Sequence, residues 1–425
     1  MLKVGMSYTV TIEETNIFAN GVCHIDGMTV FVEGAVSSEI CDVEITKVFP
    51  KYVYAKCTGI HKVSDSRVVP TCSLCDKCGG CTFSNVTQKF ENQVKLDYVR
   101  TSFRKNKIEA EFEEIVCPVD EKYRNKVVLY FHEGRFGYMA RSTNNVVAHN
   151  ECMLNDAVFD EIAAFTAKEL RDKPIRALYM RKSSHDVPQI MVCPIFYKQT
   201  DIFSYVASLV KRFPNVRTVL YSVCNDKDFA LENIKFKTLY GDGYISDVLC
   251  GLSFRISPES FYQVNHSCAQ LLYEKAINLA ELNESSVCAD LFCGTGTIGI
   301  IAGKKTGATV YGVEIVEKAV EDAKNNGKAN GVKNVHFKAM DAGKFDKAVD
   351  VCIIDPPRKG CSKFMLDTLK RLKPKKIVYI SCNVDTMARD IRELSEEYKI
   401  SSPVSVFNLF PRTSHVETVV RLAKL

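Results

Sequence analysis

The sequence lacks the features that would place the protein in or across a membrane. Its first residues, MLKVGMSYTVTIEETN, contain no continuous apolar segment of the kind found in secretory signal peptides. The longest stretch without a charged residue, 291–303, is too short and too rich in glycine for a bilayer span, which takes about 20 residues. Internal repeats and low-complexity tracts are also missing. We therefore expect a soluble cytoplasmic protein that does not act at a membrane.

A strong charge of either sign is missing as well. The net charge is +5 over 425 residues, a weak lean toward acidic partners such as nucleic acid. The chain is 46% hydrophobic and 25% charged, as in ordinary globular proteins, and its length suggests about three domains. Cysteine, in contrast, is abundant at 18 residues. Because disulfides are rare in the cytoplasm, clustered cysteines there more often bind metal or take part in chemistry.

Residues 1–61 have the pattern of a small OB-like β-barrel. Segments such as MTVFVEG and CDVEITKV alternate apolar and polar residues, and glycines supply the turns. This segment has four Lys and Arg residues against seven Asp and Glu residues, so it cannot hold nucleic acid through bulk charge. Residues 62–250 are expected to form a central α+β domain, with a cysteine-rich start, a helix at 85–107 and hairpins at 123–149.

Residues 251–425 are expected to form an α/β domain. From about residue 285 apolar strands alternate with amphipathic helices, which predicts a doubly wound, Rossmann-like parallel sheet. The expected strands are SVCADLF, ATVYGVE, VHFKA, VDVCIID and KIVYIS. The last two segments, PVSVFNLF and HVETVVRL, have no helix between them and predict a closing antiparallel hairpin.

The segment DLFCGTGTIG (290–299) follows the first strand of this sheet and opens a helix. Its G-x-G-x-x-G spacing lets the backbone turn tightly and lets a ligand lie against it. Glu314 ends the next strand and can take the ribose hydroxyls of a nucleoside, and Asp341 follows the third strand, near an adenine. A dinucleotide is the alternative ligand, but Asp290 would repel its pyrophosphate. S-adenosylmethionine has no phosphate and carries a sulfonium cation, so we expect this cofactor.

Two more loops are expected at the same edge of the sheet, because ligands of open α/β sheets bind beyond the carboxyl ends of the strands. IIDPPRKG (353–360) carries Arg358, which suggests a contact with a phosphate or carbonyl. YISCNVDT (379–386) carries Cys382 at the start of a helix, where the dipole favours a thiolate. A thiolate added to carbon 6 of a pyrimidine makes carbon 5 nucleophilic toward a methyl group. A base, for which SHVETVV offers Glu417, must then remove the carbon 5 proton.

These motifs in this order, together with FYQVN (261–265), resemble the S-adenosylmethionine-dependent RNA uracil-5-methyltransferases. The resemblance covers nearly the whole chain, because residues 1–61 are similar to the RNA-binding TRAM barrel that many members carry. It implies methylation of carbon 5 of a uridine, with Cys382 as nucleophile and Glu417 as base. Thr297 stands where some members have an asparagine and is assigned no role. The cofactor-binding residues that the resemblance implies are Gln263, Phe292, Glu314, Asp341 and Asp355.

The segment TCSLCDKCGGC contains four cysteines at uninterrupted three-residue intervals: Cys72, Cys75, Cys78 and Cys81. A zinc site usually takes two C-x₂-C pairs separated by a longer loop, whereas an iron–sulfur cluster often takes three close ligands and a distant fourth. Spacing does not identify the three, and either Cys117 or Cys152 can be the fourth. The family implies a [4Fe-4S] cluster on Cys72, Cys78, Cys81 and Cys152, with an exchange of Cys75 for Cys72 left open. Because methyl transfer is redox-neutral, we expect a structural or RNA-docking cluster.

The resemblance also bears on the substrate. In bacterial members the cluster and the barrel accompany ribosomal substrates, which implies 23S ribosomal RNA, and we expect a monomer. A tRNA uridine is the alternative within the family, and archaeal-type members with a cluster keep it open. A non-catalytic RNA-binding assembly factor is the alternative from another class. The presence of Cys382, Glu417 and Asp355 argues against that alternative.

Overall fold

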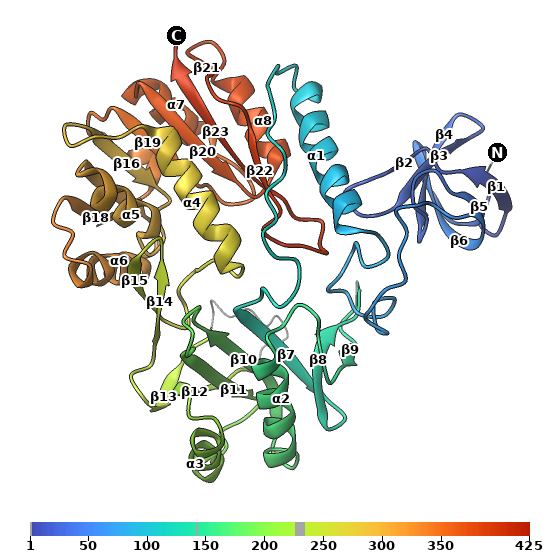
Figure 1. The fold of residues 1–425 in the computed structure, drawn as a ribbon, viewed down its shortest axis with the longest axis horizontal. Coiled ribbons are helices and arrows are strands. Elements are labelled where there is room, and N and C mark those ends of the chain that lie inside the picture. The colour runs from blue at the N-terminus through green and yellow to red at the C-terminus, as the bar shows by residue number, and fades with distance from the viewer. Residues whose placement is uncertain (1, 142, 226–233) are drawn as a thin grey trace.

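A computed structural model of the chain describes residues 2–141, 143–225 and 234–425. Three large sheets follow one another along the sequence, in the N-terminal, central and C-terminal parts of the chain (Figure 1). Within these residues no helix is long and apolar enough to cross a membrane.

The N-terminal sheet has six strands in the order β1-β5-β6-β4-β3-β2. Strands β4 and β6 are parallel, and the other pairs are antiparallel. The alternation in the sequence places Val30, Val32 and Val53 in a fully buried core, while their neighbours face outward. The expected all-β domain is therefore confirmed. Its strands are β1 (Ser7–Thr11), β2 (Glu14–Thr15), β3 (Gly21–Ile25), β4 (Met28–Glu33), β5 (Ile40–Val48) and β6 (Tyr52–Lys62).

The central sheet has seven strands in the order β13-β12-β11-β10-β7-β8-β9, followed by the hairpin β14–β15. The expected hairpins appear as the antiparallel run β7-β8-β9. Helices α2 and α3 contribute to the apolar core of this sheet. The elements are β7 (Lys126–His132), β8 (Arg135–Met139), β9 (Val146–Ala148), α2 (Ala157–Glu169), β10 (Ile175–Lys182), β11 (Ile190–Phe196), α3 (Phe203–Arg212), β12 (Val216–Val223), β13 (Lys237–Tyr240), β14 (Ile245–Leu249) and β15 (Leu252–Ile256).

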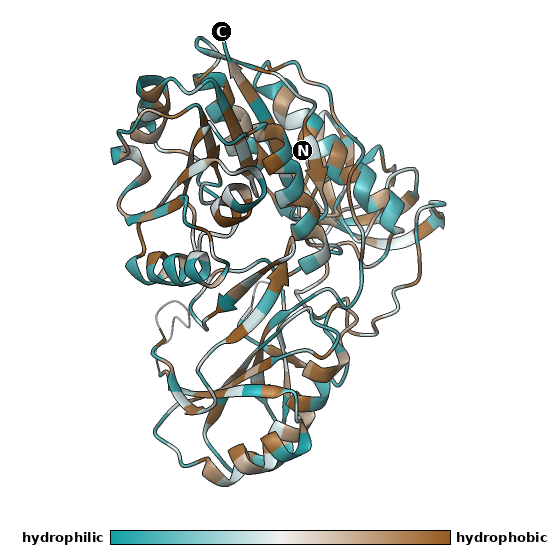
Figure 2. Cartoon of the chain, turned by 60° about the vertical axis from the view of Figure 1, so that its left-hand side comes forward, coloured by the Kyte–Doolittle hydropathy of each residue, from teal (hydrophilic) through white to brown (hydrophobic). Residues whose placement is uncertain are grey.

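The C-terminal sheet has eight strands in the order β18-β17-β16-β19-β20-β23-β21, with β22 paired to β23. The first five are parallel, as predicted, and β22 and β23 form the predicted antiparallel closure. Figure 2 shows its central strands as largely hydrophobic segments. The strands are β16 (Val287–Leu291), β17 (Thr309–Glu314), β18 (Val335–Ala339), β19 (Val351–Ile354), β20 (Lys376–Ser381), β21 (Tyr398–Ile400), β22 (Ser405–Phe407) and β23 (Glu417–Lys424).

Helices cover both faces of this sheet, which explains why its central strands are apolar. Helices α4 and α5 join one core cluster, and α7 and α8 join another. The helices are α4 (His266–Ala280), α5 (Thr297–Thr306), α6 (Glu317–Ala329), α7 (Lys363–Leu372) and α8 (Val384–Glu393), and the short 3-10 helix is η2 (Ala342–Lys344).

Helix α1 (Gln88–Lys105) contributes to the C-terminal domain, although we expected it in the central one. Leu96, Val99 and Phe103 join the same core cluster as α7 and α8, and α1 lies beside α8 (Figure 1). The two helices are tied by Asp385 of α8, which accepts hydrogen bonds from the hydroxyls of Tyr98 and Ser102. The chain around residues 112–116 then runs parallel to β22. The N-terminal half of the chain therefore supports the C-terminal sheet directly.

Candidate active site

The glycine loop between β16 and α5 turns where the sequence predicted. Gly294 and Gly296 have φ of +53° and +78°, the left-handed region that glycine adopts without strain. A Cβ on Gly296 would lie 2.6 Å from the Phe337 ring, so that glycine is needed for packing. A Cβ on Gly294 would meet nothing within 4 Å, which leaves space for a ligand there. Phe292 also has a left-handed φ of 70°, a conformation that strains a residue with a side chain.

Two acids hold the ends of this loop. The Oδ2 atom of Asp290 accepts a hydrogen bond from the Gly299 amide at 2.8 Å, at the start of α5. Glu314 ends β17, and its Oε2 accepts from the Gly294 amide at 3.2 Å. Its other oxygen accepts from the amides of Ile315 and Val316 at 2.8 and 3.0 Å. The Glu314 carboxylate is therefore fixed against the part of the loop that is open to a ligand.

Asp341 lies one strand further along the same edge. The register pairs Glu314 with Ala339 at the ends of β17 and β18, and Asp341 follows two residues later as the cap of η2. Its Oδ1 accepts from the Gly343 amide at 2.9 Å. The two acids expected to bind a nucleoside thus occupy neighbouring strand ends, as the parallel sheet requires.

The site holds several acids close enough to disturb one another. Burial raises the pKa of Asp355, which directly follows β19, to about 7. The pKa of Asp290 is also raised to about 7 by burial, with the Gly299 hydrogen bond opposing and the negative charges of Asp355 and Glu314 adding to the rise. A cation placed among these carboxylates would favour their ionised forms. This set of acids suits a positively charged ligand and not a phosphate.

Tyr273 of α4 is a site residue that sequence reasoning missed. Burial raises its pKa, Asp355 adds to the rise, and a hydrogen bond with Gln263 opposes it. Gln263 is itself buried, and its backbone carbonyl accepts from Asn125 Nδ2 at 2.9 Å. Tyr273 therefore connects the expected cofactor residue Gln263 to the acids of the sheet edge. No local motif marks it, because only the packing of α4 on the sheet places it there.

Cys382 follows β20 and precedes α8, as predicted, but its electrostatic environment is the reverse of the one expected. Its pKa is raised to about 11, first by burial and then by the charges of Glu417 and Asp355, with Arg358 opposing. The position at the start of a helix alone therefore does not make Cys382 a thiolate in this state. Partial burial and the two carboxylates together raise the pKa of the thiol. The Cys382 thiol is protonated at neutral pH until its surroundings change.

Glu417 is the first residue of β23 and lies beside Cys382. The antiparallel register pairs Ser381 with Thr418, so Cys382, one residue later on β20, lies opposite Glu417, one residue earlier on β23. Its side chain is buried, and its pKa is raised well above the usual value by burial and by Asp355, with Arg358 opposing. Strand β23 has neighbours on both sides. Glu417 is therefore a buried carboxylate on an interior strand.

Arg358 is the cation that acts on both Cys382 and Glu417. Its backbone carbonyl accepts from Asn383 Nδ2 at 2.9 Å, which joins the loop after β19 to the loop after β20. Its guanidinium lies 3.5 Å from Nε2 of His415. Because the Arg358 side chain is exposed, it can reach a ligand that enters beside Cys382.

The cysteines of the iron–sulfur prediction share one neighbourhood without forming a closed metal site. The pKa of Cys81 is raised to about 12 by burial and by the charges of Cys152, Cys78 and Cys72, while Arg124 opposes. Among the residues that the structure describes, however, no group of three or more His, Cys, Asp or Glu side chains is arranged to hold a metal ion. The cluster therefore stays a prediction. The thiols near Cys81 are suitable ligands for iron, but they are not arranged as a closed site.

Models of two known domain families match the two ends of the chain. A TRAM domain model matches residues 2–58, and a methyltransferase domain model matches residues 282–421. An uncharacterized RNA methyltransferase of Oceanobacillus iheyensis is 32% identical over 98% of this chain and 96% of its own length. One of Caldanaerobacter subterraneus is 31% identical over 100% and 99%.

A solved structure matches over nearly the full chain. The Pyrococcus abyssi tRNA (uracil-54, C5)-methyltransferase, crystallised with S-adenosyl-L-homocysteine, superposes with a TM-score of 0.79 at 25% identity. The match covers 98% of this chain and 99% of that one. Together with the glycine loop and its acids, these findings define an S-adenosylmethionine-dependent methyltransferase with a TRAM domain. The chain belongs to the family of RNA uracil-5-methyltransferases.

Proposed function

We propose that the protein methylates carbon 5 of a uridine in RNA through a covalent bond between Cys382 and carbon 6 of the base. The observation that carries this proposal is the meeting of a thiol and two acids at the ends of adjacent strands. Cys382 follows β20, Glu417 starts β23 and Asp355 follows β19, and each acid raises the pKa of the thiol. A nucleophile and a base on fixed strand ends are what addition followed by elimination requires.

The raised pKa values set the order of proton transfers. Cys382 must lose its proton as it attacks carbon 6, and Asp355 is a suitable acceptor because its pKa is about 7. The sulfonium of S-adenosylmethionine supplies the methyl group to carbon 5. An ionised Glu417 then takes the proton from carbon 5, the double bond between carbons 5 and 6 re-forms, and Cys382 leaves as a thiolate. Arg358 favours the ionised form of Glu417 that this last step needs.

The cofactor is proposed to lie between the glycine loop and the acids of the sheet edge. Glu314 and Asp341 would hold the ribose and the adenine, and Phe292 would pack against the adenine. Gln263 and Asp355 would face the methionine end, next to Tyr273. The support is that Glu314 is fixed against Gly294, where the loop is open.

We infer that the target is 23S ribosomal RNA. The support is that bacterial members of the family with a cluster and a TRAM barrel act on ribosomal RNA. The solved tRNA enzyme, which matches this chain over its whole length, favours a tRNA uridine as the second candidate. Mapping of 5-methyluridine in total RNA from cells with and without the gene separates the two. Loss of the mark from tRNA with ribosomal RNA unchanged would reject the ribosomal target, and loss from neither would favour a non-catalytic assembly factor.

We also propose that Cys72, Cys78, Cys81 and Cys152 hold a [4Fe-4S] cluster. Cys72, Cys78 and Cys152 all lie close enough to raise the pKa of Cys81, which supports this set, whereas the Cys117 thiol accepts a hydrogen bond from Gln88. Because the proposed reaction is redox-neutral, these residues would hold the fold together and take no part in the chemistry. Anaerobic purification tests the assignment, and a colourless protein that contains zinc without iron would reject it.

A further inference from the structure

Four aromatic rings gather on the outer face of the N-terminal sheet. We call this the aromatic face: Phe31 of β4, Tyr52 and Tyr54 of β6, and Phe49 in the turn between β5 and β6. The ring centroids lie 4.9 to 6.1 Å apart, in stacked, tilted and edge-on arrangements. Phe49, Tyr52 and Tyr54 are 39%, 36% and 38% exposed. The face is a continuous aromatic surface that the fold leaves open.

The barrel does not need these rings for its own core. Strand alternation turns Val53 and Ala55 of β6 inward, where they are buried, and Tyr52 and Tyr54 outward. The parallel register sets Phe31 opposite Tyr54. Apolar side chains that stay partly exposed lose part of the stabilisation that burial would give. A cluster of them on a small domain therefore marks an interaction surface.

The charges around the aromatic face indicate the kind of partner. Lys47 pairs across the strands with Tyr54, and Lys51 lies in the turn next to Tyr52. Neither lysine has an ion-pair partner among the residues that the structure describes. The barrel as a whole has more acidic than basic residues, so phosphate attraction alone cannot hold RNA there. Aromatic rings with a few local cations are instead the surface that binds unpaired bases by stacking.

We propose that the aromatic face stacks unpaired bases of the RNA substrate, while Lys47 and Lys51 contact the neighbouring backbone. This inference rests on the proposed function, since it takes the substrate to be RNA, and it assigns a surface outside the catalytic site. A protein or a second copy of the chain is the competing partner, and the test below separates them.

The test compares three variants in binding to a single-stranded RNA oligonucleotide over a range of salt concentrations. Tyr52→Ala with Tyr54→Ala should weaken binding about five- to a hundredfold and leave the slope of affinity against salt unchanged. Lys47→Ala with Lys51→Ala should lower that slope. Phe18→Ala, an exposed ring outside the cluster, is the matched control. Circular dichroism confirms that each barrel is folded.

Methylation assays keep this inference separate from the proposed function. The tyrosine double variant should raise KM for RNA and leave kcat near the wild-type value, because the catalytic site is intact. Unchanged RNA affinity in a folded double variant, with or without a change in self-association by sedimentation, would overturn the inference. A wild-type protein that binds RNA through this face but methylates no uridine would reject the proposed function alone.

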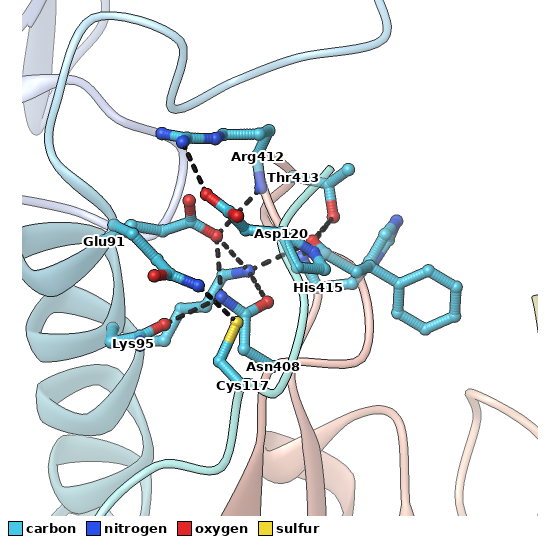
Figure 3. Close-up of polar contacts among 12 residues, drawn as sticks. Glu91, Lys95, Cys117, Asp120, Asn408, Arg412, Thr413 and His415 are labelled. Carbon is cyan, nitrogen blue, oxygen red and sulfur yellow. Dashed lines mark hydrogen bonds and ion pairs between the residues drawn. The ribbon is translucent and has the colours of Figure 1, made fainter. Parts of the chain in front are cut away.

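A second inference rests on a different observation, a buried polar network that holds the loop leading into Glu417. Lys95 of α1 is fully buried, and its Nζ donates to Asn408 Oδ1 at 2.6 Å and to the Phe410 carbonyl at 3.2 Å (Figure 3). Glu91, one turn earlier, lies 2.8 Å from Lys95 and accepts from Asn408 Nδ2 and from the Arg412 amide. The loop between β22 and β23 is thus held by side chains more than 300 positions away in sequence.

The other side of this loop is held by the segment that follows the cysteines. The Arg412 carbonyl accepts from the amides of Thr82 and Phe83, directly after Cys81. The Arg412 guanidinium donates a hydrogen bond to Asp120 at 2.8 Å (Figure 3). The Arg412 backbone has a φ of 68°, which shows that the loop is held in a strained turn. Rigid support on two sides is what a base at the end of the loop needs for its proton transfer.

We infer that Glu91 and Lys95 are positioning residues for Glu417 in the proposed reaction. The test replaces both together, as Glu91→Gln with Lys95→Met, because removing one alone would leave a buried unpaired charge. The folded double variant should lose about ten- to a hundredfold in kcat, keep its affinity for S-adenosylmethionine, and accumulate the methylated RNA–protein adduct that forms when proton removal is slow. The control is Gln93→Met, which removes an exposed hydrogen bond to Asp97 on the same helix. Wild-type kcat without adduct in the folded double variant would overturn this inference, whereas absence of activity in the wild type would reject the proposed function instead.

Discussion

The strand-end loops of the C-terminal sheet and the cysteine segment carry equally distinctive sequence patterns, yet the structure assembles them to different degrees. The loops that carry Glu314, Asp355 and Cys382 each extend a strand of one hydrogen-bonded sheet. The cysteine segment consists of turns and a single bridge, between Cys78 and Ala140. A motif at a strand end takes its position from the sheet, whereas a motif in a loop depends on what it binds. Substitutions in the two regions should therefore have different effects.

The largest effects are expected from the pair at the centre of the strand-end site. Cys382→Ala should abolish methylation and form no covalent complex, because carbon 5 is never activated. Glu417→Gln should still add the thiol and accept the methyl group, and then stall because the carbon 5 proton cannot leave. Denaturing gel electrophoresis with labelled RNA should show an adduct in the second variant only.

The control for this pair is wild-type enzyme given RNA with 5-fluorouridine at the target, which should stall in the same way because fluorine cannot leave as a cation. Turnover near the wild-type rate in Glu417→Gln, or an adduct in Cys382→Ala, would contradict the covalent mechanism.

The contrast between the regions also explains what sequence could and could not predict. The parallel sheet and its closing hairpin follow from apolar periodicity, whereas the pairing of Cys382 with Glu417 follows from the chemistry that the reaction needs and from the family resemblance. The raised pKa of Cys382 does not follow, because it depends on burial and on two carboxylates that only the packed sheet brings near the thiol. Tyr273, Glu91 and Lys95 have no local signal for the same reason. Their roles arise from α4 and α1 packing against distant elements.

The cysteine segment gives the second prediction, in which two neighbouring cysteines should behave differently. Cys81→Ser should lose the iron and colour of anaerobically purified protein, and Cys75→Ser should keep both. The reason is that Cys72, Cys78 and Cys152 lie close enough to raise the pKa of Cys81, and that the family pattern does not use Cys75. Iron analysis and absorbance spectra provide the measurement. Loss of iron in Cys75→Ser, with iron retained in Cys72→Ser, would show that Cys75 is the ligand in place of Cys72.

A smaller effect is expected from the acid beside the glycine loop. Glu314→Ala should remove charge-assisted hydrogen bonds to the ribose worth about 1.5–3 kcal/mol, and weaken S-adenosylmethionine binding roughly ten- to a hundredfold. Glu317→Ala, an exposed acid three residues later, is the matched control. Calorimetry that finds wild-type affinity in Glu314→Ala would show that the nucleoside is held elsewhere. The cysteine variants should leave this affinity unchanged if the two regions are independent.

The smallest effect concerns the pH dependence of stability, which should come from the strand-end acids and not from the cysteines. Asp290 and Asp355 have pKa values near 7 in the folded chain and near 4 when unfolded, so the folded state binds more protons between these pH values. Their contribution to stability is therefore full below about pH 4 and is lost as the pH rises through 7.

Asp290→Asn should reduce that loss, because the amide oxygen can still accept from Gly299 but no charge is buried at high pH. Thermal melts of the two proteins at pH 5 and pH 8 should differ in their pH dependence by a few degrees (~2–4 °C per kcal/mol for domains of this size). Saturating S-adenosylmethionine should reduce the loss in the wild type, because its sulfonium stabilises the ionised acids, and equal pH dependence in wild type and Asp290→Asn would contradict the assignment.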